Sequence, residues 1–224
     1  MPLTVSFVSQ KGGVGKSALA RALAVALRQA GLSVLVADLD FQQSTIGEWA
    51  KLRDSRRIEP SIAARSFKTA DDAIIAGGAA DVLIIDGPAR ASAGTLELAR
   101  QSDLVVQPSG CGLDDLRPAV LLFHELVAAG ISRERLVVAL CRTAGEPEEG
   151  AARRYLQKAK YEVLTTTLPE RLAYRDAMNR GAALTETADK TLNVRAQALI
   201  DELVKKVRAE VAARASRRRK EQAG

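Results

Sequence analysis

The sequence predicts an α/β fold, a doubly wound and mostly parallel sheet with helices on both faces. Two observations lead to this prediction. Short apolar runs, nearly continuous as in strands covered on both faces, alternate with longer stretches of helical periodicity. The resulting order of strand, helix, strand, helix favours right-handed crossovers and a parallel sheet. In such folds ligands bind at the carboxyl ends of the strands.

The expected elements follow one another along the chain. The predicted strands are Leu3–Ser9, Val34–Asp38, Val82–Asp86, Leu104–Gln107 and Leu136–Cys141. The predicted helices are Lys16–Ala30, Ser44–Arg53, Ala93–Arg100, Asp114–Ala129 and Glu148–Lys158. Gly31 and Gly130 follow two of these helices as stop signals. A long C-terminal helix is predicted by apolar residues at helical spacing, namely Leu192, Ala196, Leu199, Leu203, Val207 and Val211.

Length and composition indicate one domain. With 224 residues, 47% of them apolar, the chain can bury a single sizeable core, which we assign to residues 1–213. Residues 214–224 are expected to form a basic, disordered tail. Two cysteines and one histidine disfavour a disulfide framework and a histidine-rich metal site, and they favour a reducing, cytoplasmic compartment. The chain start does not resemble a signal peptide, and no apolar run approaches the ~20 residues that span a bilayer.

The charge of the chain is concentrated at its end. The segment from Lys205 onward carries eight basic and two acidic residues, a net +6 that equals the net charge of the whole chain. A terminal block of this kind is typical of an interaction tail or of a simply solvated end.

A glycine-rich loop, "SQKGGVGKSA" at residues 9–18, joins the first predicted strand to the first predicted helix. Gly12, Gly13 and Gly15 allow backbone N–H groups to face a phosphate, and the helix start adds its positive dipole end. Lys16 is expected to neutralise the β- and γ-phosphates, and Ser17 to bind Mg²⁺ through its hydroxyl. The alternative is a glycine-rich turn with a solvated lysine. A phosphate loop must lie between a strand and a helix, as this segment does, whereas an ordinary turn need not.

Acidic residues end two of the predicted strands. Asp38 and Asp40 close the second, and Asp86 closes the third. Carboxylates at the same edge of the sheet as the phosphate loop can hold Mg²⁺ and orient an attacking water. Because Asp38 and Asp40 are two residues apart at a strand exit, only one is expected to face the γ-phosphate, and we favour Asp40 over Asp38. Ordinary turn-initiating aspartates are the alternative.

Four segments carry a family resemblance: "QKGGVGKS", "VLVADLDFQQS", "DVLIIDGPA" and "LPERLAYRDAMNRG". Together they resemble the ParA/MinD family of deviant Walker A ATPases, most closely its small ParA-like partition proteins, over residues 3–190. The resemblance implies a P-loop NTPase fold with ATP and Mg²⁺ as cofactors. The expected nucleotide-binding residues are Lys11, Gly12, Gly13, Val14, Gly15, Lys16, Ser17 and Ala18, and the expected metal ligands are Ser17, Asp40 and Asp86.

The resemblance also gives the second loop lysine a role. In this family the residue at Lys11 reaches the phosphates bound by the other subunit of an ATP-dependent homodimer, so that Lys11, Lys16 and Asp40 are the expected catalytic residues. Three departures stand out: Ala18, Phe41 and the pair Cys141–Arg142 replace residues usual in the family. They imply slow hydrolysis and altered base contacts. Arg171 and Arg175 receive no individual roles, because surface charge explains them equally well.

The C-terminal basic residues suggest a partner. Arg214, Arg217, Arg218, Arg219 and Lys220 are expected to contact the phosphates of double-stranded DNA without sequence preference. Membrane binding is less favoured, because from Ala209 onward the only apolar residues are alanines and one valine. A solvated tail is the remaining alternative.

The expected function is therefore a dimerising ATPase that binds DNA and drives plasmid or chromosome partition in the cytoplasm, in association with the nucleoid. A ParB-like or other adaptor protein is expected to stimulate hydrolysis. Three alternatives stay open. The same switch could position another cargo, such as a protein cluster or a DNA-transfer complex. The chain could be a non-hydrolysing, ATP-dependent scaffold. Finally, the iron protein of nitrogenase shares this loop, and Cys111 and Cys141 match its number of cluster-binding cysteines.

Overall fold

A computed structural model of the chain describes residues 1–40, 45–88 and 93–222, with the backbone alone at 93, 215 and 217–222. The strands are β1 (Leu3–Phe7), β2 (Val34–Asp38), β3 (Ala63–Ser66), β4 (Val82–Asp86), β5 (Leu104–Ser109), β6 (Leu136–Thr143), β7 (Glu162–Val163) and β8 (Leu168–Pro169). The α-helices are α1 (Lys16–Gln29), α2 (Thr45–Ser55), α3 (Ala70–Ala76), α4 (Ala93–Arg100), α5 (Leu113–Ala128), α6 (Glu146–Lys158), α7 (Leu172–Met178) and α8 (Lys190–Gln222). Short 3₁₀ turns occupy Gly77–Ala79 and Arg133–Arg135.

The strands form one parallel sheet in the order β3-β2-β4-β1-β5-β6-β7, and β8 pairs with β6. Strand β1, which leads into the phosphate loop, lies in the interior between β4 and β5. Asp38 at the end of β2 pairs in register with Asp86 at the end of β4. The prediction of a doubly wound parallel fold is confirmed, and the acidic strand ends meet at one edge.

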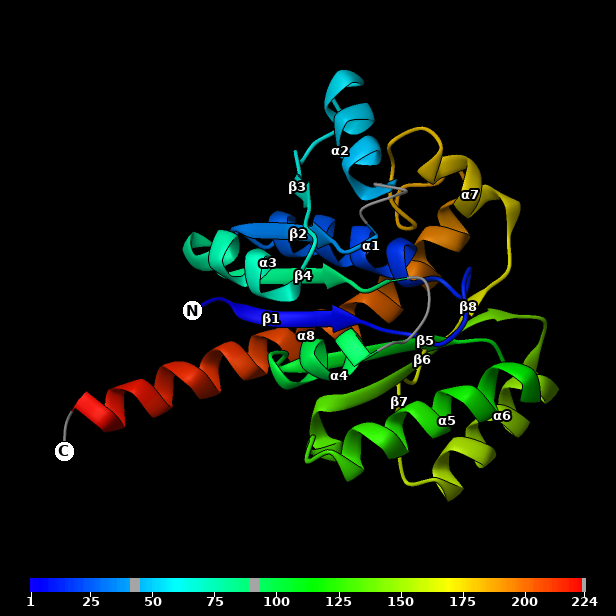
Figure 1. Cartoon of the computed structure of the whole chain (residues 1–224). Coiled ribbons are helices and arrows are strands. Elements are labelled where there is room, and N and C mark those ends of the chain that lie inside the picture. The colour runs from blue at the N-terminus through cyan, green and yellow to red at the C-terminus, as the bar shows by residue number, and fades with distance from the viewer. Residues whose placement is uncertain (41–44, 89–92, 223–224) are drawn as a thin grey trace.

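Helices cover both faces of this sheet (Figure 1). Helices α1, α2, α7 and α8 pack on one face, where alternate strand residues such as Val5, Val36 and Ile84 enter their core. Helices α3, α4, α5 and α6 pack on the other face against residues such as Leu83 and Ile85. The nearly continuous apolar runs of the strands therefore supply both cores.

Several short elements were not predicted from the sequence. Strand β3 reads AARS and is partly exposed, so it lacks an apolar run. Strands β7 and β8 have two residues each, and helices α3 and α7 have seven each. Elements of this length carry too few positions to show a period of 2 or 3.6.

Helix α8 corrects the expectation of a disordered tail. It continues to Gln222, so residues 214–222 are helical. The sequence from Lys190 to Gln222 contains neither glycine nor proline and is rich in alanine, arginine, lysine and glutamate, which favour helices. Figure 1 shows the last turns of α8 projecting beyond the sheet, at the end where β1 begins. No helix within residues 1–40, 45–88 and 93–222 is long and apolar enough to cross a membrane.

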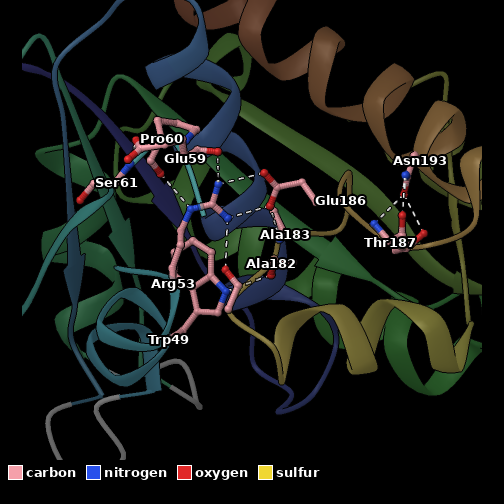
Figure 2. A network of polar contacts seen from close by, with 11 residues as sticks. Trp49, Arg53, Glu59, Pro60, Ser61, Ala182, Ala183, Glu186, Thr187 and Asn193 are labelled. Carbon is pink, nitrogen blue, oxygen red and sulfur yellow. Dashed lines mark hydrogen bonds and ion pairs between the residues drawn. The ribbon is translucent and has the colours of Figure 1, made fainter. Parts of the chain in front are cut away.

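A buried arginine fixes helix α2 against the segment that follows α7 (Figure 2). The side chain of Arg53 is fully buried and donates to the carbonyl oxygens of Glu59, Pro60 and Gly181 at 2.8–3.1 Å. Two further donors meet both carboxylate oxygens of Glu186 at 2.7 and 2.9 Å. With every donated bond directed at a fixed acceptor, α2 has one defined position beside the phosphate loop.

Candidate functional site

The phosphate loop connects β1 to α1, as predicted. Gly13 has φ of 74° and Gly15 has φ of 113°, a region of backbone conformation that residues with a Cβ rarely adopt. Gly15 is the N-cap of α1, and no side chain caps the helix. The first N–H groups of α1 are therefore left for a ligand, and together with the helix dipole they favour an anion.

A cavity of about 430 Å³ opens from this loop. Its lining comes from the phosphate loop, α1, the end of β6, and the segment from β8 through α7. The residues that line it include Gly13, Gly15, Lys16, Ser17, Arg21, Cys141, Arg142, Glu170 and Tyr174. One end is thus defined by the glycine loop and the other by the β6 and β8–α7 segments, which gives room for a nucleotide with its phosphates at the loop.

Lys16 lies inside this site, as expected. It is 7% exposed. Burial lowers the pKa of its ammonium group, while Asp86 and Asp40 act in the opposite direction. A buried cation with two nearby carboxylates is partly compensated within the protein, and a phosphate group would supply further negative charge.

Ser17 and Asp86, two of the three residues expected to bind Mg²⁺, contact each other. The Ser17 hydroxyl donates to Asp86 Oδ2 at 2.5 Å. Burial raises the pKa of Asp86 to about 7, against the lowering effects of the Ser17 hydrogen bond and of Lys16. Its other oxygen, Oδ1, is buried and accepts no hydrogen bond from the described residues. A hydroxyl and a carboxylate with a spare oxygen fit the ligand preferences of Mg²⁺. The described residues contain no group of three or more histidine, cysteine, aspartate or glutamate side chains at metal-binding spacing.

The structure separates the two aspartates at the exit of β2. Asp38 is fully buried, and its carboxylate accepts from the backbone N–H of Asp40 at 2.9 Å and of Ile46 at 3.1 Å. Burial raises the pKa of Asp38. Both of its oxygens thus serve the protein backbone, whereas Asp40 is partly exposed beside Lys16. This arrangement favours Asp40 for a role in chemistry and gives Asp38 a structural one.

Lys11 is held by its own subunit. Its ammonium lies 2.6 Å from Asp115 Oδ1 at the start of α5, and its side chain is half exposed. Gly12 and Gly13 beside it are exposed too. The lysine therefore lies at the surface of the loop with its ammonium paired to Asp115, and it is not among the residues that line the cavity.

The far end of the cavity holds Arg142, one of the departures from the family pattern, together with Glu170 and Tyr174 from the segment "LPERLAYRDAMNRG". Arg142 has φ of 57° and forms an ion pair with Glu170 at 3.2 Å. Tyr174 is buried and its hydroxyl donates to the carbonyl of Leu192 in α8. Arg21, which also lines the cavity, gave no signal because an arginine within an amphipathic helix is typical of a solvated face.

The basic end of the chain is only partly described. Arg214 donates to the carbonyl oxygen of Pro2 at 2.8 Å and forms an ion pair with Asp103. Its guanidinium is therefore used within the molecule, in contrast to the DNA contact expected of it. Arg217, Arg218, Arg219 and Lys220 lie on the helical backbone of α8, but their side chains are outside the described part. Phe41 is likewise outside it.

Comparison with protein families now identifies the chain. A family model described as "CobQ/CobB/MinD/ParA nucleotide binding domain" matches residues 5–185. The chain belongs to this family. The match spans the phosphate loop, both acidic strand ends and the segment through α7. The family resemblance seen in the motifs is thus confirmed, and the cavity beside the phosphate loop is the candidate nucleotide site.

Solved structures show the same fold. Septum site-determining protein MinD from Pyrococcus horikoshii, complexed with Mg-ADP, has a TM-score of 0.73 at 17% identity and covers 94% of this chain and 99% of its own. A ParA family ATPase from Chlorobium tepidum has a TM-score of 0.69 at 17% identity, covering 91% and 99%. The ATP complex of a single-substitution variant of McdA from Cyanothece has a TM-score of 0.68 at 16% identity, covering 90% and 96%. A comparison with curated protein sequences finds no match.

Proposed function

We propose that this family member is an ATPase whose ATP-bound form dimerises, binds duplex DNA without sequence preference and takes part in plasmid or chromosome partition. One observation carries the ATPase part. Lys16, the pair Ser17–Asp86 and Asp40 lie together at the open start of α1, which is the donor and acceptor set that phosphoryl transfer to water requires.

Each residue has a proposed task. The N–H groups of the loop and Lys16 hold the β- and γ-phosphates, while Ser17 and Asp86 hold Mg²⁺. When bound, Mg²⁺ neutralises charge on the phosphate oxygens. Asp40, partly exposed at the strand exit, orients the attacking water. The raised pKa of Asp86 means that a cation must replace a proton on this carboxyl, so metal loading is linked to proton release below about pH 7.

Lys11 connects the site to the proposed dimer. In the single subunit it pairs with Asp115, and half-exposed pairs of this kind contribute less than about 1 kcal/mol after solvent screening. Such a weak pair is easily exchanged for the more strongly charged triphosphate of a second subunit. We therefore propose that Lys11 leaves Asp115 when two ATP-loaded subunits meet.

The DNA contact is assigned to the end of α8. Arg217, Arg218, Arg219 and Lys220 concentrate positive charge there, whereas Arg214 is engaged by Asp103. A dimer would carry two such helices, and paired weak contacts raise DNA affinity without any new interaction. A ParB-like or other adaptor is the proposed stimulus for hydrolysis, in the cytoplasm and at the nucleoid.

Two alternatives share the same site. The switch could position a protein cluster or a DNA-transfer complex instead of a plasmid, or ATP could hold a scaffold together without turnover. The comparison with the iron protein of nitrogenase has less support. Burial raises the pKa of Cys111 to about 11 and of Cys141 to about 12, so neither thiol is readily deprotonated to bind iron.

Truncation after Ala213 tests the DNA assignment. Random-sequence duplex binding would be measured with ATP over a series of salt concentrations, alongside ATP hydrolysis and ATP-dependent dimerisation. We expect weaker DNA binding and a flatter salt dependence, by about 0.9 in slope for each phosphate that the protein no longer binds, with unchanged dimerisation. Full-length protein with Arg217, Arg218 and Arg219 changed to Gln is the matched control, since it keeps the helix and should behave like the truncation. Equal DNA affinity and slope in all three proteins would remove α8 from the proposal.

A further inference from the structure

Arg21 is a partly buried cation of the nucleotide cavity that the sequence did not indicate. It lies on α1, one helical turn after Ser17, and lines the cavity. Its Nη2 donates to the carbonyl oxygen of Thr45 at 2.9 Å, and its guanidinium carbon lies 5.4 Å from the centre of the Trp49 ring. Its Nε is buried and meets no hydrogen-bond acceptor among the described residues. The arginine is thus placed by one hydrogen bond and one stacking contact, both to α2.

The hydrogen bond to Thr45 belongs to a longer chain. Arg21 holds the oxygen of the Thr45–Ile46 peptide group, and Asp38 holds the N–H of the same group at 3.1 Å. The second oxygen of Asp38 accepts the backbone N–H of Asp40 at 2.9 Å. A hydrogen bond at one side of a peptide group polarises the other side, so the bonds along such a chain strengthen one another. Arg21 is connected in this way to the backbone of Asp40.

Charge supports the same connection. Asp38 is fully buried, and a buried carboxylate requires hydrogen bonds and a nearby cation. Arg21 interacts favourably with it, as it does with Asp86. Loss of the guanidinium would leave the Thr45 oxygen without this donor and Asp38 without this cation.

Helix α2 gives the chain a fixed backing. Trp49 is 3% exposed, and its indole N–H donates to the carbonyl oxygen of Ala182 at 2.9 Å (Figure 2). Arg53 lies on the Trp49 ring as well, 5.6 Å from its centre, within the network that ties α2 to Glu186. Because Ala182 and Arg53 hold the Trp49 ring in place, the contact between this ring and Arg21 fixes the distance between α1 and the first residues of α2.

We propose that Arg21 is a positioning residue for Asp40. Through the Thr45–Ile46 peptide and Asp38, Arg21 fixes the position of the Asp40 backbone near Lys16 of the phosphate loop. The inference rests on the proposed ATP hydrolysis, in which Asp40 orients water. Arg21 acts through other residues and does not itself hold the nucleotide. A role in nucleotide binding is the competing possibility, because Arg21 lines the cavity.

The test compares Arg21→Gln, Arg21→Lys and the parent protein. ATP dissociation constants would come from calorimetry, and hydrolysis rates from single-turnover measurements with duplex DNA. We expect Arg21→Gln to bind ATP within about threefold of the parent and to hydrolyse it at least tenfold more slowly. Arg21→Lys, which can still donate to Thr45, should recover part of the rate. The control is Arg28→Gln, because Arg28 is exposed at the last turn of the same helix and remote from the cavity.

Amide hydrogen exchange supplies a readout that does not depend on turnover. In nucleotide-free Arg21→Gln, the amides of Asp40 and Ile46 should exchange faster, while those in the middle of α1 and in β1 keep the parental rates. Uniformly faster exchange would indicate general destabilisation and would overturn the proposal. A loss of ATP affinity as large as the loss of hydrolysis rate would also overturn the proposal. An unchanged hydrolysis rate would overturn it too. If the parent hydrolyses no ATP even with DNA, the proposed function fails first and the role of Arg21 fails with it, whatever the exchange data show.

Discussion

Replacing Arg53 by methionine should destabilise the protein strongly, because the change keeps most of the side-chain volume and removes the charge and its hydrogen bonds. Arg53 is fully buried and donates to three carbonyl oxygens and to both oxygens of Glu186. Breaking a buried ion pair by removing one partner costs about 3–5 kcal/mol. We expect the middle of this range, since Glu186 is 22% exposed and keeps its hydrogen bond from the Ala183 N–H, which limits the cost of its unpaired charge.

Urea unfolding of nucleotide-free protein measures this effect directly. Trp49 is the only tryptophan of the chain and contacts Arg53, so its fluorescence reports the unfolding of this region. For a chain of this size the expected loss of about 4 kcal/mol corresponds to a decrease of roughly 8–16 °C in melting temperature. Arg56→Met is the control, since Arg56 is exposed three residues further on and should leave the midpoint unchanged. A loss below about 1 kcal/mol, typical of surface pairs, would refute the view that this network fixes α2.

Three further predictions concern the nucleotide site. Lys16→Ala should abolish ATP binding in calorimetry, because it removes the buried cation at the loop, and retained micromolar affinity would contradict that role. Asp40→Ala should bind ATP, stop turnover and accumulate as a dimer in light scattering; hydrolysis at the parental rate would instead direct attention to Asp38. Lys11→Ala should bind ATP yet remain monomeric, whereas Asp115→Asn, which frees Lys11, should dimerise at least as well as the parent. A normal ATP-dependent dimer of Lys11→Ala would exclude contact across the interface.

Much of the fold was predictable because the parallel sheet leaves a simple pattern in the sequence. Strands covered on both faces must be apolar throughout, so β1, β2, β4, β5 and β6 were all found. The phosphate loop and the acidic strand ends were found for a related reason, since a loop that needs positive φ requires glycine, and carboxylates directly after buried strands fit a site at the sheet edge.

The features that the sequence did not predict depend on contacts between segments that are distant along the chain. The pairing of Lys11 with Asp115 joins residues about a hundred positions apart, and neither residue type at its position indicates the other. Arg53 has the sequence context of a surface residue in an amphipathic helix, and it is buried because distant segments, among them Gly181 and Glu186, close over it. A Cβ at Gly181 would lie 2.7 Å from the Arg53 backbone nitrogen. The disordered tail was predicted from charge alone, and helix propensity in an uninterrupted α8 outweighed it.

The continuity of α8 has a geometric consequence for the basic residues at its end. In a flexible tail, only the number of charges and the length of the linker would matter. On a helix that runs unbroken from Lys190 to Gln222, one residue inserted after Ala213 would turn everything beyond it by about 100° and advance it by about 1.5 Å. Four inserted residues would nearly restore the original direction while moving the cluster about 6 Å outward. DNA affinity would then vary periodically with the number of inserted residues: it would fall when the basic cluster is turned away and recover when about one full turn has been added. The net charge would stay the same throughout.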